Sequence, residues 1–248
     1  FNRYGWIPDS YQGKDGLIIK EDTTGFVGIP VPDEKESKAQ VTLNAEIDEQ
    51  GNLKGTFELN TTGYCDFNVR NQLKHKNKDE QNIFFKSVVN SIRGGSKLIS
   101  YNFINPEDLT KDMNIKVVFE SPNYAVFQGD KVRFNIPQLS IYGANVGNYS
   151  FIQKRNYDLE LYSKRMYSYD AKVKIPEGFE VEYLPDSDGI NNKNAKYVIT
   201  SNIDNNELNF NSNFVLKDKK VNVSEYENFK KLQDGYFNRN NWIVILSK

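Results

Sequence analysis

Residues 39–62 read AQVTLNAEIDEQGNLKGTFELNTT, and this stretch decides the predicted fold. Apolar and polar residues alternate along both halves, with apolar positions at Ala39, Val41, Leu43, Ala45, Ile47, Leu53, Phe57 and Leu59. A period of two places these side chains on one face, which is typical of an antiparallel hairpin with one solvated face. Gly51 supplies the positive φ that a tight connection needs. A two-stranded ribbon is unstable alone in water, so other elements must cover its apolar face.

The composition of the 248 residues favours a β-rich protein and argues against several classes of partner. The chain contains 16 Phe, 15 Tyr and 2 Trp, together with many turn-forming residues. Its 32 basic and 33 acidic residues give a net charge of −1, which provides no electrostatic footprint for nucleic acid or an anionic membrane. No apolar run approaches the ~20 residues of a membrane span. We therefore expect neither nucleic acid nor a membrane span.

The residues that follow the hairpin predict a first β module over residues 39–138. Helical spacing over residues 64–73 precedes Asn77 and Glu80, which fit a capping box before a second helix over residues 78–93. Apolar residues of that second helix recur at helical spacing, so it can cover the apolar face of the hairpin. Further strands are predicted at residues 98–104, 113–120, 124–127 and 131–136.

Residues 139–156 are irregular and contain two glycines, so we place the internal boundary there and a C-terminal β module over 139–248. Ser224 and Glu227 fit a capping box for a helix near residues 225–237. The predicted strands of this module are 164–175, 179–184, 196–203, 207–216, 221–223 and an apolar terminal strand at 242–246. The predicted fold class is mainly β, with two antiparallel sandwich-like modules, each with a covering helix.

Residues 1–38 contain two short predicted strands, at residues 16–19 and 25–30, among turn-rich pieces with little core of their own. We interpret this segment as the exit from a preceding domain. The chain begins at Phe1 and no signal-peptide pattern follows, so we expect it to be excised or processed from a longer protein.

Three groups of residues, taken in order, carry a resemblance to a known family. The first group is Trp6-Ile7-Pro8 with Gln12-Gly13-Lys14-Asp15-Gly16-Leu17-Ile18-Ile19, and the second is the turn Asp48 to Gly51 followed by Gly63 to Arg70. The third group is Ile175-Pro176-Glu177-Gly178-Phe179, Leu184-Pro185, Tyr226, Phe229-Lys230 and Trp242-Ile243-Val244-Ile245. These groups resemble the C-terminal part of large bacterial transglutaminase-like proteins, and the resemblance spans nearly the whole chain.

Proteins of that class carry an N-terminal β-domain, a transglutaminase core and a C-terminal β-domain of unassigned function. The resemblance implies that residues 1–38 leave the core and that its cysteine, histidine and aspartate lie upstream of this chain. No catalytic residue can therefore be transferred to a position in this sequence. The resemblance also implies an attached catalytic domain as a partner, and a periplasmic, cell-surface or secreted location.

Cys65 is the only cysteine, which excludes an internal disulfide and a cysteine-based zinc cluster. The Gly63-Tyr64-Cys65 sequence at a predicted helix start faintly resembles a nucleophile at a helix N-terminus. A thiolate needs a base, and the only histidine, His75, lies ten residues further on, at ~15 Å of helical rise. We interpret Cys65 as a packing residue and His75 as a surface residue.

Arg70 and the residues around Asp186 are two further candidate sites. Arg70 comes two helical turns after Gly63, where its guanidinium could brace the hairpin or a domain junction, and we favour a structural role. The Asp186-Ser187-Asp188-Gly189 sequence places oxygen ligands close together but lacks the closing Glu of a calcium loop. An ordinary turn is therefore the preferred interpretation.

The tyrosines between residues 142 and 169 form a candidate binding surface for a sugar or a protein, with Tyr142, Tyr149, Tyr157 and Tyr162 as its main members. The alternation of Tyr167 and Tyr169 indicates that some of these rings are in the core. The carboxylates Glu46, Asp48 and Glu58 lie on the solvated face of the hairpin, without the convergence that a glycosidase requires.

The resemblance implies a non-catalytic accessory module that scaffolds a catalytic core or binds a protein or cell-envelope partner. No cofactor, metal site or catalytic residue is predicted. The alternative is a carbohydrate-binding β-module that uses the tyrosine-rich region. A third hypothesis, an independent enzyme, would require activity that depends on Cys65.

Overall fold

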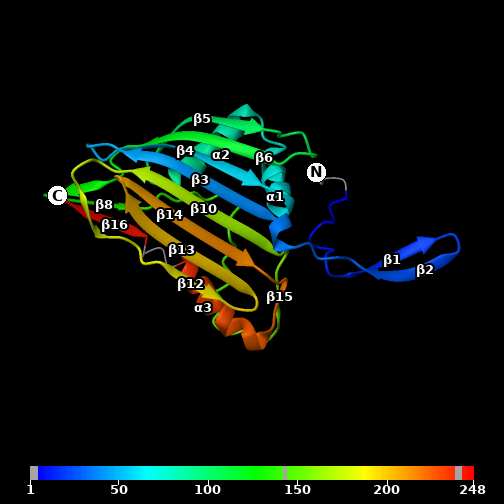
Figure 1. The fold of residues 1–248 in the computed structure, drawn as a ribbon. Helices are drawn as coiled ribbons and strands as arrows, with labels where there is room; N and C mark the ends of the chain where they lie inside the picture. Colours follow the sequence, from blue (N-terminus) through cyan, green and yellow to red (C-terminus); the bar gives the residue numbers. More distant parts are fainter. Residues whose placement is uncertain (1–4, 142–143, 238–241) are drawn as a thin grey trace.

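The computed structural model describes residues 5–141, 144–237 and 242–248, and the predicted mainly β class is confirmed. The largest unit is an eight-stranded sheet (Figure 1), with the order β12 (Asp188–Asn191), β13 (Ala195–Asp204), β14 (Glu207–Leu216), β10 (Arg165–Lys174), β3 (Lys38–Ile47), β4 (Leu53–Thr61), β6 (Met113–Ser121) and β5 (Lys97–Ile104).

The hairpin predicted at residues 39–62 lies at the centre of this sheet as strands β3 and β4. Ala39 pairs with Thr61 and Ile47 with Leu53, so the alternation places Leu43 and Phe57 together on the buried face. Gly51 closes the turn at φ 81°, and a Cβ atom there would lie 2.5 Å from the carbonyl oxygen of Ala125. The turn therefore requires glycine for both its conformation and its space.

The arrangement of the strands differs from two separate sandwiches, because the predicted modules share the main sheet. Strands β3, β4, β5 and β6 come from residues 39–138, and β10, β12, β13 and β14 come from residues 139–248. The two groups meet where β3 and β10 pair in parallel, with Val41 opposite Tyr169. This pairing removes the two free edges that separate sheets would have exposed there.

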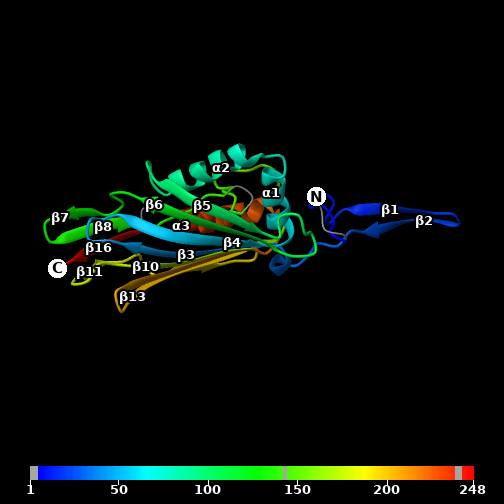
Figure 2. The same ribbon diagram turned by 90° about the horizontal axis from the view of Figure 1, so that it is seen from above.

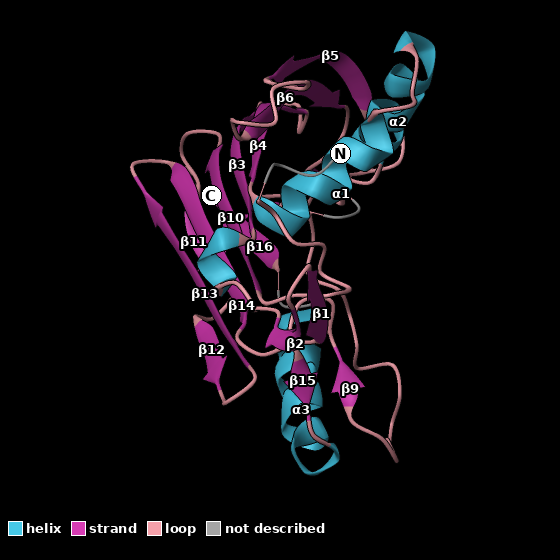
Figure 3. Ribbon diagram, turned by 90° about the vertical axis from the view of Figure 1, so that its right-hand side faces the viewer, coloured by secondary structure: helices cyan, strands magenta, loops and turns pink. Residues whose placement is uncertain are grey.

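Helices α1 (Gly63–Leu73), α2 (Lys78–Asn90) and α3 (Tyr226–Phe237) cover one face of the sheet (Figure 2). The sequence places mostly polar side chains on the other face. Helices α1 and α2 lie against the half that contains β3, β4 and β5, and α3 lies against β13 (Figure 3). The capping box predicted at Asn77 and Glu80 is present at α2. Before α3, Ser224 lies inside a 3-10 turn, Val223–Glu225, and not at a helix cap.

A second, four-stranded sheet lies at one end of the covered face, in the order β11 (Glu180–Tyr183), β16 (Ile243–Ser247), β8 (Lys131–Asn135) and β7 (Val126–Gln128) (Figure 2). The terminal strand predicted at residues 242–246 is therefore confirmed as an interior strand, β16. The indole ring of Trp242 packs 4.7 Å from the ring of Phe210, which joins the two sheets in one core.

Two small ribbons complete the fold. Strands β9 (Leu159–Glu160) and β15 (Lys220–Val221) pair briefly, and β1 (Asp15–Lys20) pairs with β2 (Thr23–Gly28) in a hairpin that projects from the body (Figures 1 and 2). Among the described residues, no helix has the length and hydrophobicity required to cross a bilayer.

Candidate functional site

The projecting hairpin, here called the arm (residues 15–28), exposes large apolar side chains. Phe26 is 81% exposed and Ile19 is 75% exposed, and Leu17, which pairs directly with Phe26, is also exposed. No third strand joins β1 and β2 among the described residues. Isolated two-stranded hairpins are marginal in water, so these exposed side chains make the arm a candidate interaction surface.

The apolar residues of the arm are unequally divided between its two faces. Strand alternation places Leu17, Ile19 and Phe26 on one face, and Ile18 and Val27 on the other. All five are exposed. The first face carries the three largest exposed fractions, so it is the stronger candidate for an interface.

A short segment before the arm anchors it to the body, and we call this contact the joint. Its members are Trp6, Asp9, Gln12, Gly63 and Lys219. A Cβ at Gly63, where φ is +55°, would lie 2.8 Å from the Trp6 ring, so glycine allows the indole to approach the start of α1. The Nζ atom of Lys219 donates hydrogen bonds to the carbonyl oxygens of Asp9 at 2.9 Å and Gln12 at 2.7 Å. These bonds join residues more than 200 positions apart.

The carboxyl group of Asp9 is the most perturbed ionisable group of the joint. Asp9 is 7% exposed, and its Oδ1 atom accepts a hydrogen bond of 2.9 Å from Nε2 of Gln12. Burial raises the pKa of Asp9 to about 6, although the nearby charge of Lys219, the Gln12 hydrogen bond and Arg165 each favour the ionised form. Docking of the segment is therefore coupled to protonation near neutral pH.

Arg165 lies beneath the joint and connects it to three tyrosines. Its guanidinium carbon is 5.4 Å from the centre of the Tyr64 ring, and one guanidinium nitrogen donates to the hydroxyl of Tyr149 at 2.9 Å. Tyr64 in turn stacks on Tyr162 with ring centres 6.4 Å apart. The Arg165 guanidinium and the rings of Tyr64 and Tyr162 thus form a cation–aromatic cluster next to the joint.

Arg70 is 4% exposed and holds the connection between β5 and β6 onto α1, not the hairpin at residues 39–62. Its Nε atom donates to Asp66 at 2.8 Å, and its terminal nitrogens donate to three backbone carbonyl oxygens, at Asn105 (2.7 Å), Pro106 (2.6 Å) and Lys111 (3.0 Å). A guanidinium engaged by four acceptors is suited to bracing a loop.

Cys65 and His75 do not form a catalytic pair. The Cys65 side chain is 3% exposed and lies near Ala39 and Phe214, and burial raises the pKa of its thiol to about 12. His75 is exposed beyond the end of α1. A protonated, buried thiol is a poor nucleophile, so the geometry is that of a packing residue.

The acidic candidates occupy ordinary structural positions. Asp188 lies in β12, which is an edge strand of the main sheet and not a simple turn. Its carboxylate accepts hydrogen bonds from the Tyr197 hydroxyl and the Gly189 amide. Asp48 accepts hydrogen bonds from the backbone amides of its turn. Glu46 and Glu58 form surface ion pairs with lysines. Within the described residues, no cluster of His, Cys, Asp and Glu could hold a metal ion.

The structure separates the tyrosines that the sequence groups together. Tyr157 and Tyr162 are exposed, at 82% and 64%, whereas Tyr149 is half-buried and bonded to Arg165. Tyr142 lies outside the described residues. The exposed part of the predicted surface therefore reduces to Tyr157 and Tyr162.

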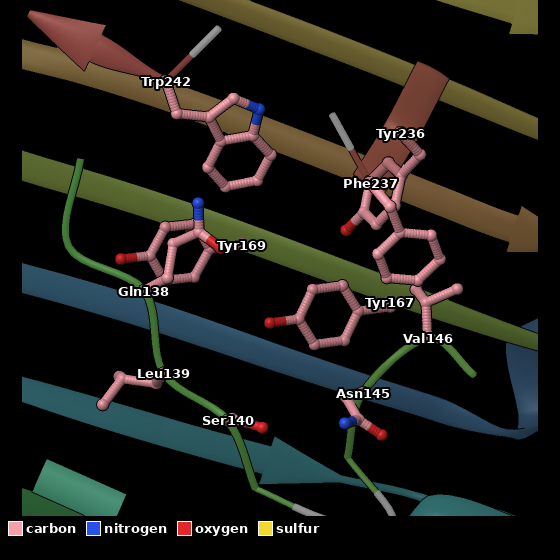
Figure 4. Close-up of a pocket in the computed structure, with 10 residues that line it drawn as sticks. All are labelled: Gln138, Leu139, Ser140, Asn145, Val146, Tyr167, Tyr169, Tyr236, Phe237 and Trp242. Atoms are coloured by element: carbon pink, nitrogen blue, oxygen red, sulfur yellow. The ribbon is translucent and has the colours of Figure 1, made fainter. Parts of the chain in front are cut away.

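Tyr167 and Tyr169 line an aromatic cavity together with Tyr236, Phe237 and Trp242 (Figure 4). Its volume is about 70 Å³, well below the ~300 Å³ at which small-molecule sites begin. The hydroxyl of Tyr169 donates to the carbonyl oxygen of Pro137. The cavity can hold a few waters but not a sugar ring.

Sequence reasoning missed the joint and the exposure of the arm, although both strands of the arm were predicted. The side-chain pattern Leu17, Ile18, Ile19 is apolar on both faces, which normally indicates burial on both faces. This two-sided apolar pattern was the sequence signal that could have identified the arm as a surface in need of a covering partner. The Asp9–Lys219 contact has no local signature, because its members lie at opposite ends of the chain.

Comparisons with known proteins show that the C-terminal part of the chain is similar to a family model without an assigned function. Residues 134–246 match the model of DUF3858, a domain of unknown function with a solved structure. Among solved structures, the "putative protease" from Parabacteroides distasonis ATCC 8503 is 18% identical, with a TM-score of 0.43. That match covers 49% of this chain and 24% of the other chain. No curated protein matches the chain.

Proposed function

We propose that the chain is a non-catalytic accessory module that uses the arm to pack against a neighbouring catalytic domain. The observation that carries this proposal is the exposure of Leu17, Ile19 and Phe26 on one face of a two-stranded hairpin. Such a face is covered in a stable assembly. The joint fixes the direction of the arm, because Lys219 holds the segment that leads into it.

The resemblance of residues 6–19 to the exit from a transglutaminase core supports a catalytic domain as the neighbour. In this proposal the parent protein is transglutaminase-like, acts in the cell envelope or outside the cell, and supplies all catalytic residues. The accessory role is further supported by Cys65, whose buried thiol has no imidazole beside it.

Hydrogen exchange tests the proposal by comparing the 248-residue chain with a longer protein that includes the adjoining catalytic domain. We expect the amides of residues 15–28 to exchange rapidly in the 248-residue chain and slowly in the longer protein. Phe26→Ser should restore rapid exchange in the longer protein, whereas Lys20→Ser, a polar control on the same arm, should not. Equal exchange in both proteins would show that no neighbouring domain covers the arm.

A carbohydrate-binding role is the second candidate, because Tyr157 and Tyr162 are exposed aromatic rings on either side of β9. Exposed rings can stack on sugar faces. Affinity-gel retardation on neutral and acidic polysaccharides tests this role. Retardation that disappears in Tyr157→Ala and Tyr162→Ala would support this role. Free migration of the unsubstituted 248-residue chain on every gel would eliminate it.

A further inference from the structure

A groove of about 600 Å³ lies between the residues that follow α2 and the outer face of the four-stranded sheet. Val126, Arg133 and Ile245 form one row across β7, β8 and β16, since Arg133 pairs with both of the others. Their side chains point away from the core, because the alternating residues Val132 and Val244 are buried. Arg93 and Tyr124 form the opposite wall.

This wall is held in place by two hydrogen bonds. A terminal nitrogen of Arg93 donates to the carbonyl oxygen of Tyr124 at 2.6 Å, and the hydroxyl of Tyr124 donates to the carbonyl oxygen of Asn135 at 2.7 Å. The first bond uses one of the five guanidinium N–H groups of Arg93, and within residues 5–141, 144–237 and 242–248 the other four form no hydrogen bond. The groove is thus largely formed before any partner arrives.

Positive charge is concentrated in this groove, although the chain as a whole has a net charge of −1. Arg93, Lys131 and Arg133 line it, and none of the lining residues is acidic. Lys131 pairs with Glu182 at 2.6 Å. Neither arginine forms an ion pair within the described residues, and the residues outside that range include no aspartate or glutamate. Two guanidinium groups are therefore left without a carboxylate partner.

Apolar side chains separate these charges. Ile92, Val126 and Ile245 line the same groove, and Val126 is more than half exposed. Guanidinium groups recognise carboxylates through paired hydrogen bonds, and arginine with apolar neighbours is enriched at protein interfaces. The groove is therefore complementary to a ligand that carries both carboxylates and apolar groups.

We propose that this groove binds an extended acidic segment of a protein partner, whose carboxylates pair with Arg93 and Arg133 while its apolar side chains pack on Val126 and Ile245. This surface is distinct from the arm, which projects from the opposite end of the molecule (Figure 2). The inference goes beyond the accessory role and does not depend on it. A polyanion such as nucleic acid is a poorer fit, because such ligands engage many cations along a track.

Fluorescence anisotropy tests the proposal on the 248-residue chain with a fluorescein-labelled, C-terminally amidated peptide of sequence Glu-Leu-Glu-Phe-Glu. The comparison probes are Gln-Leu-Gln-Phe-Gln, which has the same shape without charge, and inorganic phosphate as a competitor. We expect the acidic peptide to bind at low salt and the neutral peptide to bind at least tenfold more weakly.

Arg133→Gln should weaken binding of the acidic peptide about tenfold, the loss of one charge-assisted contact. Arg155→Gln removes the same charge from a residue that does not line the groove, and it should leave the affinity unchanged. Because Arg133 is exposed, circular dichroism should give Arg133→Gln the melting temperature of the unsubstituted chain. Arg93→Gln removes the guanidinium of the opposite wall and should also weaken binding of the acidic peptide.

Equal binding of the two peptides, unchanged affinity in Arg133→Gln, or no binding of the acidic peptide at low salt would each overturn the proposal. Full competition by phosphate at concentrations equal to those of the peptide would do so as well, because the groove would then be a general anion site.

Discussion

The arm and the central hairpin are built on the same local plan but have opposite environments. Both β1–β2 and β3–β4 are antiparallel ribbons with facing apolar side chains. Phe57 on β4 is fully buried, whereas Phe26 on β2 is 81% exposed. The central hairpin gains β10 on one edge, β6 on the other and helices over one face, while the arm gains none of these. Strand pairing alone therefore does not bury a side chain; neighbouring layers do.

Truncating the same residue type in each hairpin tests this contrast most strongly. Phe57→Ala should lower the free energy of unfolding by about 4 kcal/mol, because it removes a buried ring and leaves a cavity. Urea denaturation followed by circular dichroism measures the change. A loss below about 1 kcal/mol would mean that the central hairpin is no better packed than the arm.

The ion pair inside the body provides the next comparison. Arg70→Met should destabilise the chain by about 3 kcal/mol, because it leaves the Asp66 carboxylate buried without its guanidinium partner. Lys116→Met breaks the exposed pair with Glu58 and should cost less than about 1 kcal/mol. Both are measured by urea denaturation, and equal effects would contradict the bracing role of Arg70.

The joint between the two regions should respond to pH. The folded-state pKa of Asp9 is raised from 3.8 to about 6, so its protonated form stabilises docking fully below about pH 4, and this contribution disappears as the pH rises through 6. Asp9→Asn keeps a carbonyl acceptor but cannot ionise. At pH 7 the free energy of local opening of residues 6–14 should be about 1–2 kcal/mol larger in Asp9→Asn than in the unsubstituted chain.

Hydrogen exchange of residues 6–14 between pH 4 and pH 7, corrected for intrinsic rates, measures this effect. Protection in the parent chain should fall with rising pH, and protection in Asp9→Asn should stay level. Parallel pH profiles for the two proteins would rule out Asp9 as the titrating group.

The smallest effect is expected in the arm. Phe26→Ala should change the free energy of unfolding by less than about 0.5 kcal/mol, since the ring is exposed in the folded chain. It should also reduce concentration-dependent association, which sedimentation velocity measures. A loss comparable to that of Phe57→Ala would show that the arm is packed in solution and would remove the contrast between the hairpins.

Several elements could be predicted from local pattern. The alternation at residues 39–62 predicted β3 and β4, the Asn77–Glu80 capping box predicted α2, and the apolar residues 242–246 predicted an interior strand. The packing interpretation of Cys65 agrees with its burial. These predictions depend on side-chain periodicity and on hydrogen bonds between residues a few positions apart.

Other features required contacts that no local pattern specifies. The shared sheet depends on Tyr169 lying beside Val41, and the joint depends on Lys219 reaching the carbonyl oxygen of Asp9. The candidate groove combines Arg93 with Arg133, which belong to different layers. Each of these sites is assembled from segments that are remote in the chain.

The order of residues thus determined the central hairpin, α2 and the terminal strand, because periodicity and backbone preferences act within one segment. Packing decided which hairpin became the core, which became the arm and where charges were left without partners. The physical reason is that burial and pairing depend on the layers that surround a strand, and an identical alternation is compatible with a covered or an exposed face.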